Sequence, residues 1–296
     1  MLFALLFGIA FNFLSQSDGF SPGIELSSSR LLKIGVALLG ARITFSDVAA
    51  LGVVPVMIVI ICLFTTIGIG VFLSSQFGRS RAFGLLTGGA VAICGASAAL
   101  ALTSVLPKGK NGIGEQDTIF TVIAVTSMST VAMVFYPVII SYWGINDTAA
   151  GVFLGATIHD VAQVVGAGYS VSTEVGDTST IVKLLRVAML VPIIAAISLL
   201  SAKDQPTSGS VRGSFPLFLV GFVALAFANS MGWIPAQVGT LLGELSKYAL
   251  VMALAALGVK TSFAKLIDVG PLAMAIIVIE TIWIALVAIV GLQFIL

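Results

Sequence analysis

A histidine–aspartate pair in the middle of an apolar stretch is the feature of this sequence best suited to chemistry. His159 is the only histidine of the chain; Asp160 follows it, and Gln163 lies one helical turn further on the same face. Histidine changes charge near neutral pH, and a carboxylate accepts a proton or holds a cation. We therefore expect a substrate or proton site here. The alternative is a structural hydrogen bond between helices.

Three further ionisable residues lie inside apolar stretches. Lys183 and Arg186 form an i, i+3 pair, and Glu280 lies in the segment IIVIETIWIAL. The two cations predict a contact with an anionic substrate, because guanidinium and ammonium groups bind anions well. Snorkelling of both side chains to the lipid headgroups is an equally weighted alternative. Glu280 is either an ion-coupling carboxylate or a contact between helices.

Two glycine-rich segments carry polar residues at the same depth. They are residues 84–106 and 149–170, and each predicts a broken helix, because unwound backbone survives in a membrane only when it lines a cavity or is buried in protein. The N-termini of half-helices then offer N–H groups to an anion. Close packing of small residues is the alternative. The substrate-binding residues that we expect are Gly89, Cys94, Gly95, Ser97, Gly155, His159, Gln163, Lys183 and Arg186, and the coupling residues are His159, Asp160 and Glu280.

The elements that position these residues must be membrane helices. Of 296 residues, 58% are hydrophobic and only 9% are charged, whereas about 25% are charged in soluble domains. This composition excludes a soluble globular protein, and a net charge of +1 argues against a nucleic-acid binder.

Residues 1–14 lack a basic region and a cleavage signal, so we expect a short first helix, with a natural start upstream as an alternative. We expect about ten spans in a single transmembrane domain, residues 1–296, at approximately 1–14, 30–46, 52–76, 83–106, 118–142, 149–170, 180–201, 214–231, 245–263 and 270–296.

An internal repeat organises the two ends of the chain, at approximately 1–76 and 214–296. Residues 39–52 read LGARITFSDVAALG, and residues 257–270 read LGVKTSFAKLIDVG. At an offset of 218 the match keeps leucine, glycine and a cation in register, and further upstream Asn12 matches Asn229 at an offset of 217. The copies are an odd number of spans apart, which predicts the inverted repeat of secondary transporters. Coincidence in a biased composition is the alternative.

The chain resembles a known family across nearly its whole length. The segments LLKIGVALLGARITFSDV, AICGASAAL, GATIHDVAQVVGAG and VKLLRVAMLVP look like the YeiH (UPF0324) family of membrane proteins, whose members carry a sulfate-exporter label. The family motif maps onto Cys94, Gly95, His159, Asp160, Gln163, Lys183 and Arg186. The resemblance implies the fold of transporters related to bile-acid transporters and cation/proton antiporters: inverted repeats, crossing broken helices and a core that moves against a scaffold. Family members usually have one more span before the one that matches residues 1–14.

The sequence therefore predicts an all-α polytopic protein of the bacterial inner membrane that transports a small anion, sulfate or a sulfonate, by coupling to H⁺ or Na⁺. We expect contacts with membrane lipid, no metal and no cofactor; a homodimer is a candidate assembly, because transporters of this type are often dimers. A passive anion channel is the main alternative. A membrane component that only binds a partner is disfavoured, because the loops are short. An enzyme is not expected: a zinc helix of the H-E-x-x-H type lacks its second histidine, and an intramembrane Ser97–His159 hydrolase leaves the repeat unexplained.

Overall fold

The computed structural model describes residues 1–16, 19–109, 112–201, 217–261 and 271–294, and these residues fold into helices without a β-strand. The elements, in chain order, are α1 (Leu2–Ala10), η1 (Asn12–Gln16), α2 (Ser21–Glu25), η2 (Leu26–Leu31), α3 (Leu32–Leu39), α4 (Phe45–Ala50), α5 (Val53–Gln76), α6 (Arg81–Ala92), α7 (Ala96–Thr103), α8 (Glu115–Trp143), α9 (Asp147–Thr157), α10 (Val161–Val171), α11 (Thr173–Ala188), α12 (Leu190–Ser201), α13 (Leu217–Ser230), α14 (Ala236–Lys260) and α16 (Pro271–Leu292).

Five of the described helical stretches are long and apolar enough to cross a membrane. They are Val53–Gln76, Glu115–Trp143, Thr173–Ser198, Ala236–Lys260 and Pro271–Leu292. The all-helical prediction is confirmed, whereas the described residues do not confirm the expected count of about ten spans. Several predicted spans are divided into short helices, because backbone breaks interrupt them.

Two predicted boundaries need correction. The stretch expected at 180–201 begins earlier, at Thr173, so Lys183 and Arg186 lie well inside it instead of within its first two turns. The region 15–29 was expected to be a loop, but α2 and η2 make residues 21–31 helical and continuous with α3. Pro22 stands at the start of α2, where its missing N–H costs nothing.

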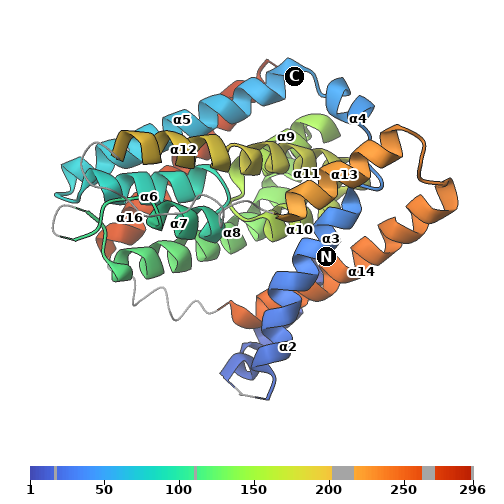
Figure 1. Cartoon of the computed structure of the whole chain (residues 1–296), viewed down its shortest axis with the longest axis horizontal. Helices are drawn as coiled ribbons and strands as arrows, with labels where there is room; N and C mark the ends of the chain where they lie inside the picture. The colour runs from blue at the N-terminus through green and yellow to red at the C-terminus, as the bar shows by residue number, and fades with distance from the viewer. Residues whose placement is uncertain (17–18, 110–111, 202–216, 262–270, 295–296) are drawn as a thin grey trace.

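The helices pack as two groups (Figure 1). The smaller group contains α1 to α4 with α13 and α14, so it joins the two ends of the sequence. The larger group contains α5 to α12 with α16 and holds most of the buried core. Contacts between the groups include those of α10 with α1 and α14. The residues expected to carry the chemistry lie in the larger group.

The smaller group has reciprocal contacts between the two segments that the repeat matched. The Asn12 amide donates to the carbonyl of Thr261 (3.0 Å), and the Asn229 amide donates to the carbonyl of Ile43 (3.3 Å). Asn12 matches Asn229 at an offset of 217, and Ile43 matches Thr261 at an offset of 218. Each asparagine therefore binds the other copy at the same place.

The matched glycines form a second reciprocal pair. A Cβ at Gly258 would lie 2.2 Å from the carbonyl oxygen of Leu5, and a Cβ at Gly40 would lie 2.2 Å from that of Phe222. Helix α1 therefore packs on α14 as α3 packs on α13, and only glycine permits this approach of the two backbones. Of the matched motif in the second copy, residues 262–270 lie outside the described part of the chain.

Candidate functional site

The first predicted broken helix is interrupted between α6 and α7. Gly95 has φ +64°, in the left-handed region where a side chain is strained, and its N–H donates to the carbonyl of Ala90 (2.8 Å). This hydrogen bond closes the C-terminal end of α6, where a glycine commonly ends a helix. Helix α7 then begins at Ala96, with Gly95 as an N-cap that offers no side chain to the first N–H groups.

The second predicted broken helix is interrupted between α9 and α10, and no glycine makes this break. Ile158 is extended (φ −66°, ψ 135°), and Asp160 caps α10 by accepting a hydrogen bond from the N–H of Ala162 (2.9 Å). The backbone N–H of Asp160 donates to the Ser129 hydroxyl of α8 (3.0 Å). The aspartate starts the second half-helix, because its carboxylate satisfies an N-terminal N–H group.

Two of the glycines that predicted the breaks lie inside helices instead. A Cβ at Gly89 would meet the side chain of Leu102 at 2.5 Å, and a Cβ at Gly155 would meet the carbonyl oxygen of Ser179 at 2.5 Å. The packing alternative therefore describes these two positions. Of the predicted glycines, only Gly95 shapes a break through its own dihedral angles.

The two breaks meet. The Cβ position of Gly95 lies 3.7 Å from the backbone and the Cβ of His159. The ammonium group of Lys183, on α11, joins both breaks by donating to the carbonyls of Ile93 (2.7 Å) and Ile158 (3.0 Å). The structure thus brings together the residues that the sequence had placed in separate segments.

Arg186 completes this junction from the next turn of α11. Its guanidinium donates five hydrogen bonds of 2.6–3.1 Å to backbone carbonyls at the C-terminal ends of α6 and α9. The acceptors are the carbonyls of Val91, Ala92, Gly155, Ala156 and Ile158. The last carbonyls of a helix have no hydrogen-bond donor within the helix, and inside a membrane no water supplies one. Arginine fits this place because it has five donors and no acceptor.

The contacts of Lys183 and Arg186 differ from those expected under either interpretation of these residues. Both side chains have 0% exposed area, so neither snorkels to the lipid headgroups. Their hydrogen bonds go to backbone carbonyls, so the contacts seen here give them a positioning role for the breaks. Their two positive charges still remain next to the site.

The charges near the junction add up to a positive value. Lys183 and Arg186 contribute two positive charges, and Asp160, when ionised, contributes one negative charge. Each helix end carries about half a charge, so the two C-terminal and two N-terminal ends meeting here cancel. About one positive charge is left, which favours an anion.

His159 is fixed by α16. Its Nε2 lies 3.0 Å from the Thr281 hydroxyl, and that hydroxyl itself donates to the carbonyl of Ile277 (2.7 Å). The Thr281 proton is thereby used, so neutral His159 must donate from Nε2. Its Nδ1 is then an acceptor, buried and without a partner among the described residues. The contact with Thr281 thus fixes the orientation of the His159 ring at the junction.

Gln163 occupies the next turn of α10. Its amide donates to the Thr130 hydroxyl of α8 (3.0 Å), and Thr130 in turn donates to the carbonyl of Thr126 in its own helix (3.0 Å). Thr130 was not among the site residues expected from the sequence. Such hydroxyls are abundant in apolar helices, so no pattern singles one out.

Glu280 lies beside the first broken helix, not at the junction itself. Its Oε1 accepts a hydrogen bond from the Thr87 hydroxyl of α6 (2.8 Å), while its Oε2 is buried without a partner in the described part of the chain. The whole side chain has 0% exposed area. Thr87 and Thr281 were both missed from the sequence; the only signal for Thr281 is that it follows Glu280.

Cys94 and Ser97 contact each other at the first break. The Ser97 hydroxyl donates to the Cys94 carbonyl (3.1 Å) and lies 2.8 Å from its sulfur. His159 meanwhile binds Thr281, so the Ser–His dyad of a hydrolase is not formed in this arrangement. Ser97 is exposed, whereas Cys94 is buried.

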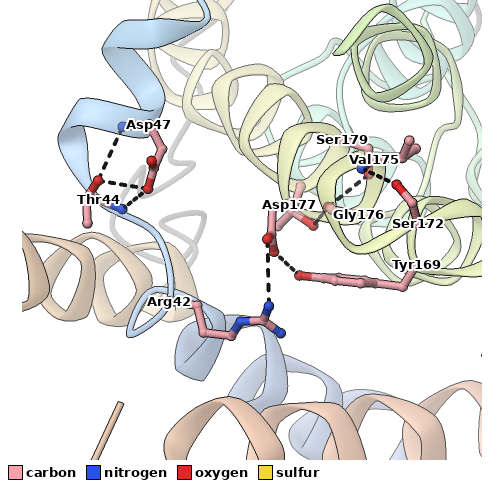
Figure 2. Close-up of polar contacts among 10 residues, drawn as sticks. Arg42, Thr44, Asp47, Tyr169, Ser172, Val175, Gly176, Asp177 and Ser179 are labelled. Atoms are coloured by element: carbon pink, nitrogen blue, oxygen red, sulfur yellow. Dashed lines mark hydrogen bonds and ion pairs between the residues drawn. The ribbon is translucent and has the colours of Figure 1, made fainter. Parts of the chain in front are cut away.

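A polar contact between the two helix groups lies away from the junction (Figure 2). Arg42, after α3 in the smaller group, is 3.8 Å from the Asp177 carboxylate of α11, which also accepts a hydrogen bond from the Tyr169 hydroxyl of α10. A pocket of about 400 Å³ lies beside Arg42 and is also lined by Lys247 and Glu244 of α14. The ion pair of Arg42 ties one helix group to the other.

Comparison with known proteins identifies the family. The family model described as Conserved hypothetical protein 698 matches residues 1–289. A UPF0324 membrane protein of Chlorobaculum tepidum is 48% identical over 288 residues, which cover 96% of this chain and 80% of that protein. The UPF0324 membrane protein TauZ of Paracoccus denitrificans is 47% identical over 298 residues, which cover 99% of this chain and 87% of that protein. No solved structure matches the chain. The described residues include five helices able to span a membrane; this is a bacterial membrane protein, and it belongs to the UPF0324 family.

Proposed function

We propose that this protein is a secondary transporter of a small anion, sulfate or a sulfonate, and that the anion binds where the two broken helices meet. The observation that carries the proposal is the junction itself: two interrupted helices held at membrane depth by two buried cations, Lys183 and Arg186. Irregular backbone at this depth is tolerated where it is buried in protein or lines a cavity, and transporters use it for binding.

The uncapped N-terminus of α7 is the part of the junction that suits the anion. Gly95 leaves the first N–H groups of α7 without a side-chain cap, and the exposed Ser97 hydroxyl lies in the same turn. The unpaired Nδ1 of His159, a residue whose backbone and Cβ lie next to Gly95, becomes a donor when the ring is protonated. Lys183 and Arg186 then act on the anion through their charge, while their hydrogen bonds hold the breaks.

Transport requires that the site open to each side in turn. The reciprocal contacts of Asn12 and Asn229 support an inverted repeat in the smaller group, which would serve as the scaffold for the larger one. We assign the coupling of anion movement to an ion gradient to His159 and Asp160 at the junction together with Glu280, whose neighbour Thr281 contacts His159. The protein works in the bacterial inner membrane.

Sulfate counterflow in proteoliposomes tests this function. Vesicles loaded with unlabelled sulfate should accumulate external labelled sulfate with saturable kinetics, and methanesulfonate should compete whereas chloride should not. His159→Ala should reduce the rate at least tenfold, because it removes the imidazole ring at the junction and its contact with Thr281. Gln237→Ala, which changes an exposed polar residue of α14, should leave the rate unchanged.

The outcomes separate the alternatives. Non-saturable sulfate flux that internal sulfate does not stimulate would identify a channel. Absence of flux for both sulfate and methanesulfonate in wild type would refute anion transport by this protein. Equal counterflow in wild type and His159→Ala would remove His159 from the mechanism.

A further inference from the structure

Two neighbouring residues of α16 bind the two broken helices separately. Glu280 accepts the hydrogen bond of Thr87, which lies on α6 of the first broken helix. Thr281, the next residue, contacts His159 at the break of the second (3.0 Å). Any displacement of the Glu280 side chain that moves α16 is therefore transmitted to the junction.

Glu280 has no charged partner within the described residues. None of the three ion pairs found there involves it, and its Oε2 has no hydrogen bond. The Thr66 hydroxyl, one turn before Gly70 on α5, is also buried without a partner. An ionised carboxylate without compensation is very costly at this depth, so the group must take up a cation.

The packing around Glu280 favours a proton over a metal ion. A Cβ at Gly70 would lie 2.6 Å from Glu280 Oε1, 2.8 Å from the carbonyl oxygen of Gly84 and 2.9 Å from the Cα of Gly88. Helices α5 and α6 thus touch through glycines where the carboxylate lies. A sodium ion needs several oxygen ligands and room for itself, whereas a proton adds no volume.

We propose that Glu280 binds the coupling proton of the transport cycle, and that the Glu280–Thr281 pair transmits its loading to the junction of the broken helices. When the proton leaves, the carboxylate is charged and lacks a partner in this packing. Helix α16 then shifts relative to α5 and α6, and Thr281 carries His159 with it. This inference rests on the proposed transport function and names its coupling ion.

Infrared difference spectroscopy tests proton binding without any substrate. Wild-type protein in lipid should show a protonated carboxyl band that disappears as the pH is raised. Glu280→Gln should lack this band, and Glu244→Gln, at an exposed position of α14, should keep it. Thr87→Val should shift the band, because the carboxyl loses its hydrogen bond. A wild-type spectrum without such a band, or an identical one in Glu280→Gln, would overturn the proposal, as would loss of the band on adding Na⁺ at constant pH.

A second assay follows protons during transport. In proteoliposomes containing a pH-sensitive dye, a sulfate gradient should move protons in wild type and in Glu244→Gln. Glu280→Gln should retain sulfate counterflow but lose at least 90% of the proton movement. Equal proton movement in Glu280→Gln and wild type would refute the role of Glu280 in coupling.

The link through Thr281 needs its own variants. Thr281→Val should keep the carboxyl band and uncouple proton movement from sulfate, and Thr281→Ser should restore the coupling. Unchanged coupling in Thr281→Val would refute transmission through this residue. If wild type transports no sulfate, the transport function fails, but the infrared titration still decides whether Glu280 carries a proton.

Discussion

Replacing Arg186 by lysine is the most direct test of how the junction is held. The substitution keeps the positive charge but reduces the donors from five to three. All five hydrogen bonds of Arg186 go to backbone carbonyls, so at least two hydrogen bonds at the ends of α6 and α9 are lost, although the Ile158 carbonyl keeps the one from Lys183. Hydrogen bonds between membrane helices contribute about 0.6 kcal/mol on average and about 1.7 kcal/mol at most. We therefore expect Arg186→Lys to lower the free energy of unfolding by about 1 to 3 kcal/mol.

The assay is reversible unfolding in mixed detergent micelles as the SDS fraction is increased, followed by circular dichroism. Arg30→Lys is the matched control, because Arg30 also lies on a helix but is exposed; we expect its effect to be within about 0.5 kcal/mol. Equal free energies of unfolding for the two variants would show that the guanidinium bonds do not hold the breaks. A loss far above about 3 kcal/mol would show that the charge is misplaced in the lysine variant, and that hydrogen bonds alone do not account for the role of Arg186.

Two further predictions use glycines and the same unfolding assay. Gly95→Ala should lower the free energy of unfolding by about 1 to 2 kcal/mol, since φ is +64° and a Cβ is strained there; Gly68→Ala, in an ordinary helical position with open space around it, should be neutral or stabilising by up to about 1 kcal/mol. A Gly95→Ala protein as stable as wild type would contradict the backbone geometry of the first break. Gly40→Ala and Gly258→Ala should each cost about 1 to 3 kcal/mol, because each new Cβ would lie 2.2 Å from a carbonyl oxygen. A marked difference between these two variants would speak against equivalent roles for the two matched segments.

The sequence predicted that both glycine-rich segments are interrupted, but glycine marks only one of the two interruptions. Gly95 correctly indicated the first interruption, because a glycine after a helix readily takes the left-handed conformation. Gly155 does not mark the second interruption, because its missing side chain permits close packing against α11. The second interruption instead follows Thr157, where α9 ends, and Asp160 caps the start of α10.

The roles of the buried cations depended on contacts that no spacing reveals. Lys183 and Arg186 could be recognised as unusual because charge is rare in this chain, and the i, i+3 spacing placed them on one helix face. Their partners are main-chain carbonyls 25 to 95 residues away in sequence. Every residue has such a carbonyl, so residue types do not indicate which carbonyls accept these hydrogen bonds. The same difficulty applies to Thr87, whose partner Glu280 is 193 residues away.

By itself, the sequence determined that this is a helical membrane protein, that charged residues are rare in it, and which segments at its two ends match. Hydropathy and the scarcity of charge determine these features locally, because lipid tolerates neither open backbone nor free charge. Only the tertiary structure decided that the two breaks meet, that Arg186 and Lys183 hold them, and that Glu280 and Thr281 each bind a different broken helix. The physical reason is that buried polar groups must find partners wherever the packing of distant helices provides them.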